Sequence, residues 1–119
     1  MAASAWKGRA PGRGVTGVAT SAAGAGVKAV NAQGGPALSV EGAAVFSRSG
    51  IVTVEAGKSS ATESNVALTA ASLVLAMLQQ NVAGVSVQSA VPDVPGSSFT
   101  VHLSKAVTAS TKVAWFVAN

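Results

Sequence analysis

The strongest constraint on the fold is an alternation of apolar and polar residues in the second half of the chain. Residues 99–104 carry apolar side chains at every second position, namely Phe99, Val101 and Leu103. A period of two is typical of a β-strand that buries one of its faces. We therefore expect a strand here, with these three side chains in a core and Thr100 and His102 turned outward.

Neighbouring segments continue this rhythm of strands and turns. Residues 50–57 read as a strand that is closed by a glycine, and residues 85–89 alternate in the same way as residues 99–104. Residues 93–96 contain a Pro-Gly pair, which predicts a turn, and a second turn is expected at residues 108–111. Short strands with turns between them predict a β-sandwich-like domain over residues 50–119.

The closing segment, residues 112–117, is apolar on both faces of the expected strand. Val113, Trp115 and Val117 would share one face, and Ala114 and Phe116 the other. A strand that is apolar on both sides lies in the middle of a sheet or is covered by another subunit. We expect one face of this strand in the domain's own core and the other toward a partner chain.

Residues 65–80 are ambiguous between helix and strand. Asn65 could cap a helix, and the alanines and leucines that follow have high helix propensity. Alternatively, the segment forms two strands, with residues 66–68 ending at a bend at residues 69–71 before a second strand at residues 72–79. Because the segment is apolar nearly all round, periodicity does not decide between the two. The surrounding strands favour the second interpretation.

The first half of the chain contains a loose repeat. Short Val-containing segments recur at residues 14–18, 26–30, 36–40 and 43–46, and small residues and glycines lie between them. Such spacing is typical of stacked β-units, each of which needs neighbours to bury its apolar face. The alternative is a flexible Gly/Ala-rich linker. The pattern favours a repetitive β-stem at residues 13–49, preceded by a flexible basic arm at residues 1–12.

Composition points to assembly. Apolar residues make up 49% of the chain but aromatic residues only 4%, so a single copy has few large side chains with which to build a core. Burial between copies would supply the missing area, and we expect a homotrimer. The expected interface residues are Val15, Val18, Val27, Val30, Leu38 and Val40 in the stem, and Val113, Trp115 and Phe116 in the closing strand.

Catalytic and metal-binding motifs are not evident. The chain has no cysteine, one histidine and four carboxylates, which stand apart in the sequence. No nucleophile elbow or phosphate-binding loop is recognisable. The net charge of +4 comes from scattered basic residues, of which only Lys7, Arg9 and Arg13 come close to clustering. Trp6 is the only aromatic residue near them, so no nucleic-acid contact is expected. We expect no enzyme, cofactor, metal site or membrane insertion, and no signal peptide is visible.

The Gly-Val repeats and the ending Lys112-Val113-Ala114-Trp115-Phe116-Val117 resemble bacteriophage tail-fibre and tailspike-like chains, which also occur in actinobacterial genomes. The resemblance implies an all-β, intertwined trimer with a β-helix-like stem and a C-terminal β-sandwich knob. It also implies a virion or extracellular location.

The resulting expectation is a structural protein whose knob attaches to a cell-surface glycan or protein through loops such as residues 91–98. One alternative is a self-assembling scaffold or shell protein without a ligand. A more distant one is a glycan depolymerase fragment that uses Glu41 and Glu55.

Overall fold

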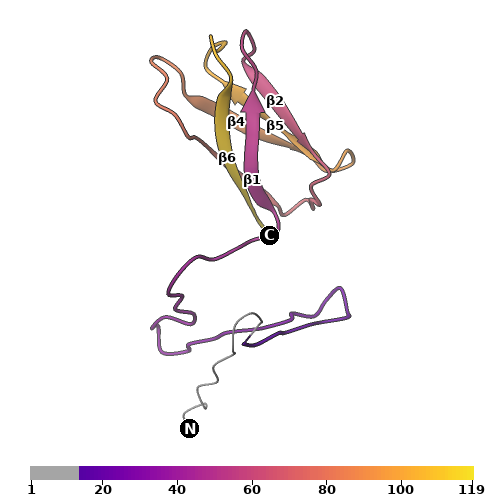
Figure 1. Cartoon of the computed structure of the whole chain (residues 1–119). Coiled ribbons are helices and arrows are strands. Elements are labelled where there is room, and N and C mark those ends of the chain that lie inside the picture. The colour runs from indigo at the N-terminus through magenta and orange to yellow at the C-terminus, as the bar shows by residue number, and fades with distance from the viewer. Residues whose placement is uncertain (1–13) are drawn as a thin grey trace. The chain divides into compact units, whose positions relative to one another are not determined.

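The computed structural model describes residues 14–119 and divides the chain into two units, Met1–Ala44 and Val45–Asn119 (Figure 1). The second unit begins ahead of the boundary expected at residue 50. The basic arm expected at residues 1–12 lies outside the described residues.

The second unit is all-β, and residues 14–119 contain no helix. Its six strands are β1 Ser49–Val54, β2 Ser60–Ser64, β3 Leu73–Leu78, β4 Val87–Asp93, β5 Ser98–Leu103 and β6 Thr111–Ala118.

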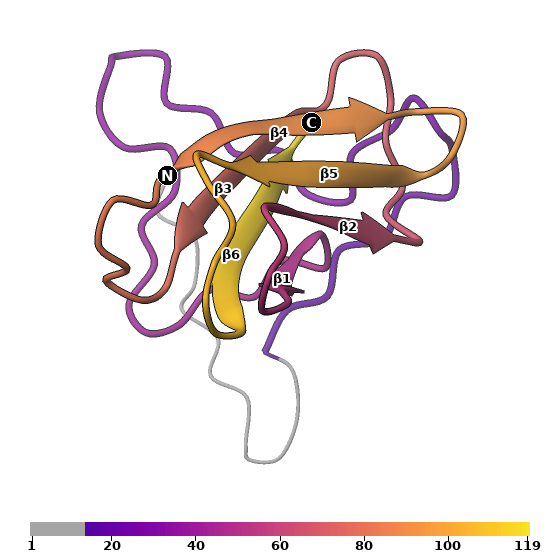
Figure 2. The ribbon, with the colours of Figure 1, turned by 90° about the horizontal axis from the view of Figure 1, so that it is seen from above.

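The strands form two antiparallel, three-stranded sheets, ordered β1-β6-β3 and β2-β5-β4. We call these the first and the second sheet. Figure 2 shows them packed face to face, with the last strand, β6, between β1 and β3. In the register, Trp115 of β6 lies between Gly50 of β1 and Ala76 of β3. The closing strand is therefore central in its sheet, as its two apolar faces predicted.

The core lies between the two sheets. Phe99, Val101 and Leu103 of β5 all point inward, as the alternation predicted. From β6, Val113 and Trp115 face them, and the rings of Phe99 and Trp115 meet edge to face with centroids 5.0 Å apart. Such a pair adds roughly 0.5–1.5 kcal/mol beyond area burial. The indole Nε1 of Trp115 is buried without a hydrogen-bond partner.

The ambiguous segment is a turn followed by a strand, so the second of its two expected strands is confirmed, while residues 66–68 form no strand. The amide of Ser72 donates to the carbonyl of Thr69 over 3.0 Å, and β3 begins at the next residue. Asn65, the possible helix cap, instead has φ +59° at the end of β2. Sheet formation prevails over helix propensity because it places Val74, Ala76 and Leu78 against the core.

The strands differ most from expectation at three places, the first being β1, which was expected over residues 50–57 and ends at Val54. The sequence analysis did not identify β2, whose residues Ser-Ala-Thr-Glu-Ser bring only Ala61 to the core as an apolar side chain. The strand expected at residues 85–89 instead begins at Val87 and continues to Asp93. The turn expected at residues 93–96 follows directly, and residues 94–97 connect β4 to β5.

Residues 14–48 contain no strand, so the short strands expected within residues 13–49 are not formed in the single chain. The chain still folds back on itself: a Cβ at Gly17 would lie 2.5 Å from the carbonyl oxygen of Gly26. Two segments therefore approach more closely than any side chain allows. Strands need partners for their amide and carbonyl groups and for their apolar faces, and residues 14–48 do not pair with one another as strands.

Candidate assembly surface

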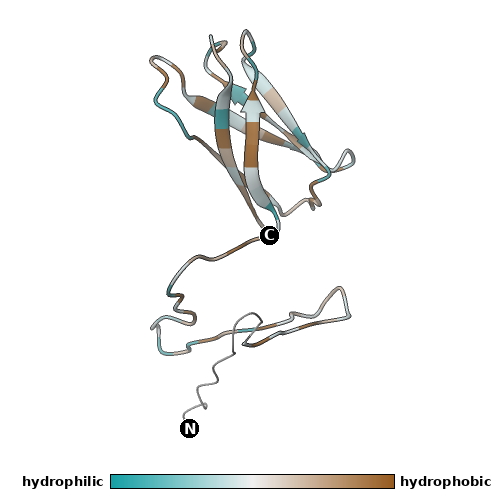
Figure 3. Cartoon of the chain, in the orientation of Figure 1, coloured by the Kyte–Doolittle hydropathy of each residue, from teal (hydrophilic) through white to brown (hydrophobic). Residues whose placement is uncertain are grey.

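The outer face of the first sheet is apolar. Its outward side chains on β3 are Leu73, Leu75 and Met77, which are 58%, 58% and 71% exposed. Ile51 of β1 lies in register with Ala114, and Phe116 lies in register with Leu75. Among the outward positions of these three strands, the charged one is Lys112, at one end of the face. Brown bands along β1 and β6 mark apolar residues in Figure 3.

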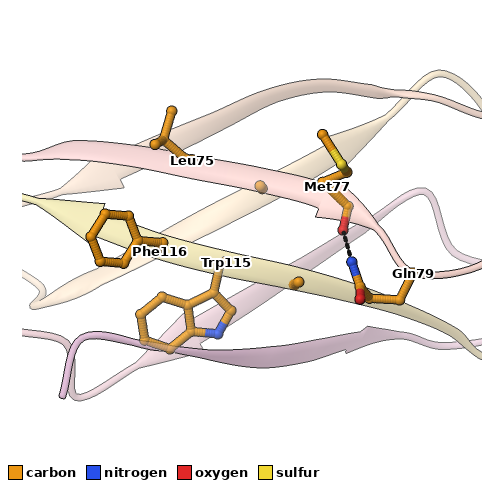
Figure 4. Close-up of a pocket in the computed structure, with 7 residues that line it drawn as sticks. Leu75, Met77, Gln79, Trp115 and Phe116 are labelled. Atoms are coloured by element: carbon orange, nitrogen blue, oxygen red, sulfur yellow. Dashed lines mark hydrogen bonds between the residues drawn. The ribbon is translucent and has the colours of Figure 1, made fainter. Parts of the chain in front are cut away.

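A shallow hollow of about 460 Å³ lies on this face between β3 and β6. Figure 4 shows Leu75 and Met77 standing side by side on β3, with Phe116 on the neighbouring strand. Gln79 borders the hollow, and its side-chain amide donates to the carbonyl of Met77 over 3.4 Å. The hollow is thus walled mainly by apolar groups.

The residues that lead into β1 border the same face. Phe46 is 56% exposed and packs edge to face on Phe116, with ring centroids 5.1 Å apart. Two residues later, the Arg48 guanidinium donates to the carbonyl of Ala67 over 3.1 Å and to the main-chain oxygen of Asn119 over 2.9 Å. Arg48 therefore holds together the start of β1, the segment before β3 and the end of β6. The two phenyl rings pack on each other, and Phe116 lines the hollow.

The outer face of the second sheet has the opposite character. Thr62 of β2 and Thr100 of β5 lie opposite each other, and their hydroxyls are 2.8 Å apart. The other outward positions on this face, apart from the 48% exposed Val91, are polar: Ser60, Ser64, Ser89, Asp93, Ser98 and His102. This face is suited to water.

The edge strands of the two sheets also differ: those of the second sheet are protected against pairing with another chain, and those of the first sheet are not. In the second sheet, edge strand β4 contains Pro92 and an irregular register between Val87 and Ser89, and edge strand β2 contains Glu63. Proline, bulges and charges on edge strands prevent pairing with other chains. The first sheet's edge strands, β1 and β3, contain neither proline nor charge. Both its outer face and its edges remain open to a partner.

The expected interface residues fall into three groups. Val113 and Trp115 belong to the core between the sheets, because their exposed fractions are 0% and 9%. Phe116 lies on the outer face of the first sheet. The remaining six are between 55% and 79% exposed in the first unit: Val15, Val18, Val27, Val30, Leu38 and Val40.

Titratable groups do not gather into a reaction centre in the described part of the chain. Within residues 14–119, no cluster of three or more histidines and carboxylates is positioned to hold a metal ion. His102 lies exposed on the polar outer face, and the Glu55 carboxylate accepts a hydrogen bond from the Ser110 hydroxyl over 3.2 Å. The same residues form no helix of the length and apolarity needed to cross a membrane.

Sequence reasoning did not identify four of the residues that form the apolar face: Ile51, Leu73, Leu75 and Met77. For the three residues of β3 the alternation signal was hidden, because this strand reads Leu-Val-Leu-Ala-Met-Leu and is apolar on both sides. A central strand reads in the same way. Its position at an edge, with one side in contact with nothing, follows only from the sheet order.

Comparison with protein-family models, with curated proteins and with solved structures finds no match to this chain.

Proposed function

We propose that this chain is a non-catalytic structural subunit that assembles with copies of itself, with the β-sandwich as a knob and the first unit as a stem. The observation that carries the proposal is the apolar surface that the single chain leaves uncovered. Monomeric proteins rarely expose contiguous apolar surface of more than a few hundred Å², and larger patches mark interaction sites.

The first unit supports assembly independently of the sandwich. Its close approach at Gly17 and Gly26 orders the backbone, which costs roughly 1–2 kcal/mol per residue. The large apolar side chains of residues 14–44 remain exposed, so these residues do not offset the cost by burial. Neighbouring copies can cover these valines and pair with the free backbone groups. A threefold, β-helix-like stem is the arrangement that the sequence repeat and the tail-fibre resemblance favour.

Attachment to a cell-surface glycan or protein is the second part of the proposal, together with a virion or extracellular location. The hairpin turn between β4 and β5 offers a firm, exposed tip for such contacts. The Gly96 amide donates to the Asp93 carboxylate over 3.2 Å, and the carbonyl of Ser97 accepts from the Val66 amide over 2.9 Å. A scaffold without a ligand has the same assembly surfaces but does not use this turn.

The test of assembly is the solution mass of the full chain by sedimentation equilibrium at micromolar concentration. We expect a trimer, and a monomer at every concentration would contradict the proposal. Binding to a glycan array and to whole bacterial cells then separates an attachment protein from a scaffold. A glycan-degrading activity that disappears in Glu41→Gln or Glu55→Gln would favour the depolymerase instead.

A further inference from the structure

We infer that the outer face of the first sheet is where the sandwiches of the assembled copies pack together, each copy turning this face toward the threefold axis and against the same face of its neighbours. This inference rests on the proposed function, and it names the partner and the surface. The face consists of outward residues of β1, β6 and β3 together with Phe46.

The exposed apolar area fits an interface between subunits. Five side chains of this face are each about half exposed or more: Phe46, Ile51, Leu73, Leu75 and Met77. Taking roughly 200 Å² for a fully exposed large apolar side chain, these five present roughly 600 Å² together. The partly exposed Phe116, Ala114 and Ala118 bring the face toward the ~800 Å² per partner of a standard interface.

The face is charged only at one end, so the surface that packs on it must itself be apolar. Lys112 lies at one end, beside Thr53, where its ammonium group stays in water at the rim. No carboxylate occupies any outward position of β1, β3 or β6. A charged or strongly polar partner would lose its hydration here and gain no hydrogen-bond partners. The second sheet, whose outer face is polar, therefore does not fit against this face.

A second copy of the first sheet meets these requirements. Its outer face is equally apolar and uncharged at the centre, and it presents both a hollow and projecting side chains, Met77 and Phe46, that can enter the hollow of a partner. The unprotected edges β1 and β3 lie on this sheet, whereas both edges of the second sheet carry a proline, a bulge or a charge. Face and edges thus both direct association to the first sheet.

The test compares lysine substitutions on the two outer faces of the full chain. Ile51→Lys and Met77→Lys place a charge on the first sheet. Val91→Lys is the matched control, because Val91 is on an edge strand of the second sheet and is 48% exposed, against 49% for Ile51. Sedimentation equilibrium gives the association constant, and circular dichroism shows whether each variant is folded.

Three results are distinguishable. Weaker association by about 30-fold or more in both first-sheet variants, with Val91→Lys unchanged, supports the inference. If the first-sheet variants assemble like the unmodified chain, the inference fails while the proposed function stands, with the first unit as its interface. If the unmodified chain is itself a monomer, both fail.

Cysteine labelling provides a second measurement in case a lysine variant does not fold. The chain has no cysteine, so Met77→Cys and Val91→Cys each introduce a unique thiol. We expect the rate of maleimide labelling to fall as protein concentration rises for Met77→Cys but not for Val91→Cys. A Met77→Cys thiol that reacts equally fast at all concentrations excludes a second copy on this face. A thiol that stays protected at concentrations where the protein is a monomer shows that another part of the same chain covers this face, which also overturns the inference.

Discussion

The outer faces of the two sheets differ, although each sheet has three antiparallel strands and contributes its inner side to one core. Outward positions of the first sheet carry Leu73, Leu75 and Met77, while equivalent positions of the second carry Thr62, Thr100 and other polar residues. The edges differ in parallel, since Pro92 and Glu63 protect the second sheet alone. Polar side chains and protected edges suit a face to water, and the first sheet has neither.

The largest predicted effect tests whether the inner sides of the two sheets contribute equally to the stability of the core. Phe99→Ala in the second sheet and Trp115→Ala in the first should each destabilise the sandwich by about 3–5 kcal/mol, because both rings fill the same core. Urea unfolding measures this loss. Trp115→Phe should cost much less, since it keeps a ring and removes the unpartnered indole N–H. A small loss for Trp115→Ala would mean that contacts outside the core hold the first sheet.

A smaller effect is expected at the end of the first sheet. Arg48→Ala removes two hydrogen bonds from a charged donor to main-chain oxygens, and we expect a loss of about 2 kcal/mol in the free energy of unfolding. Lys58→Ala, an exposed basic residue after β1, is the control and should change stability by less than about 0.5 kcal/mol. Equal losses in the two variants would show that Arg48 does not hold the sheet end.

On the second sheet, the outward pair Thr62 and Thr100 should contribute weakly. A double-mutant cycle with valine at both positions should give a coupling energy of about 0.2–1 kcal/mol from the cross-strand hydroxyl contact. Thermal unfolding of the four proteins measures it. The same substitutions should leave association unchanged. Stronger association would show that apolar side chains on either outer face are enough to make copies associate.

Salt should have the smallest effect. Because the apolar face is charged only at Lys112, raising NaCl from about 0.05 to 0.5 M should change the association constant by less than about twofold. Sulfate should strengthen association, since it favours the burial of apolar surface. Sedimentation in the two salts provides the measurement. A steep fall of the association constant with NaCl would show that the basic residues, and not the apolar face, hold the copies together.

Local patterns in the sequence were sufficient for much of the sandwich. Period-two alternation identified β5 and its inward residues, and the Pro-Gly pair identified the turn after β4. The two apolar faces of residues 112–117 left a central strand and a strand covered by a partner as alternatives, and the strand order shows that it is central. Strand β2 was missed because its small polar residues resemble a loop. The strands expected in the stem were inferred from the spacing of the repeat, and residues 14–48 form none. A regular spacing in the sequence does not by itself supply the hydrogen-bond partners that a strand needs.

The sequence by itself therefore determined that β1, β5 and β6 become strands and which side of β5 is buried, because alternation and turn chemistry are local. Only the tertiary structure decided which strand lies where. The apolar segment of residues 73–78 is an edge strand, and Val113 and Trp115 belong to the chain's own core. Strand order depends on pairings between residues far apart in the chain, such as Leu75 with Phe116. The pairing fixes the outward side of β3, and Leu73, Leu75 and Met77 stay exposed there on the outer face of the sandwich.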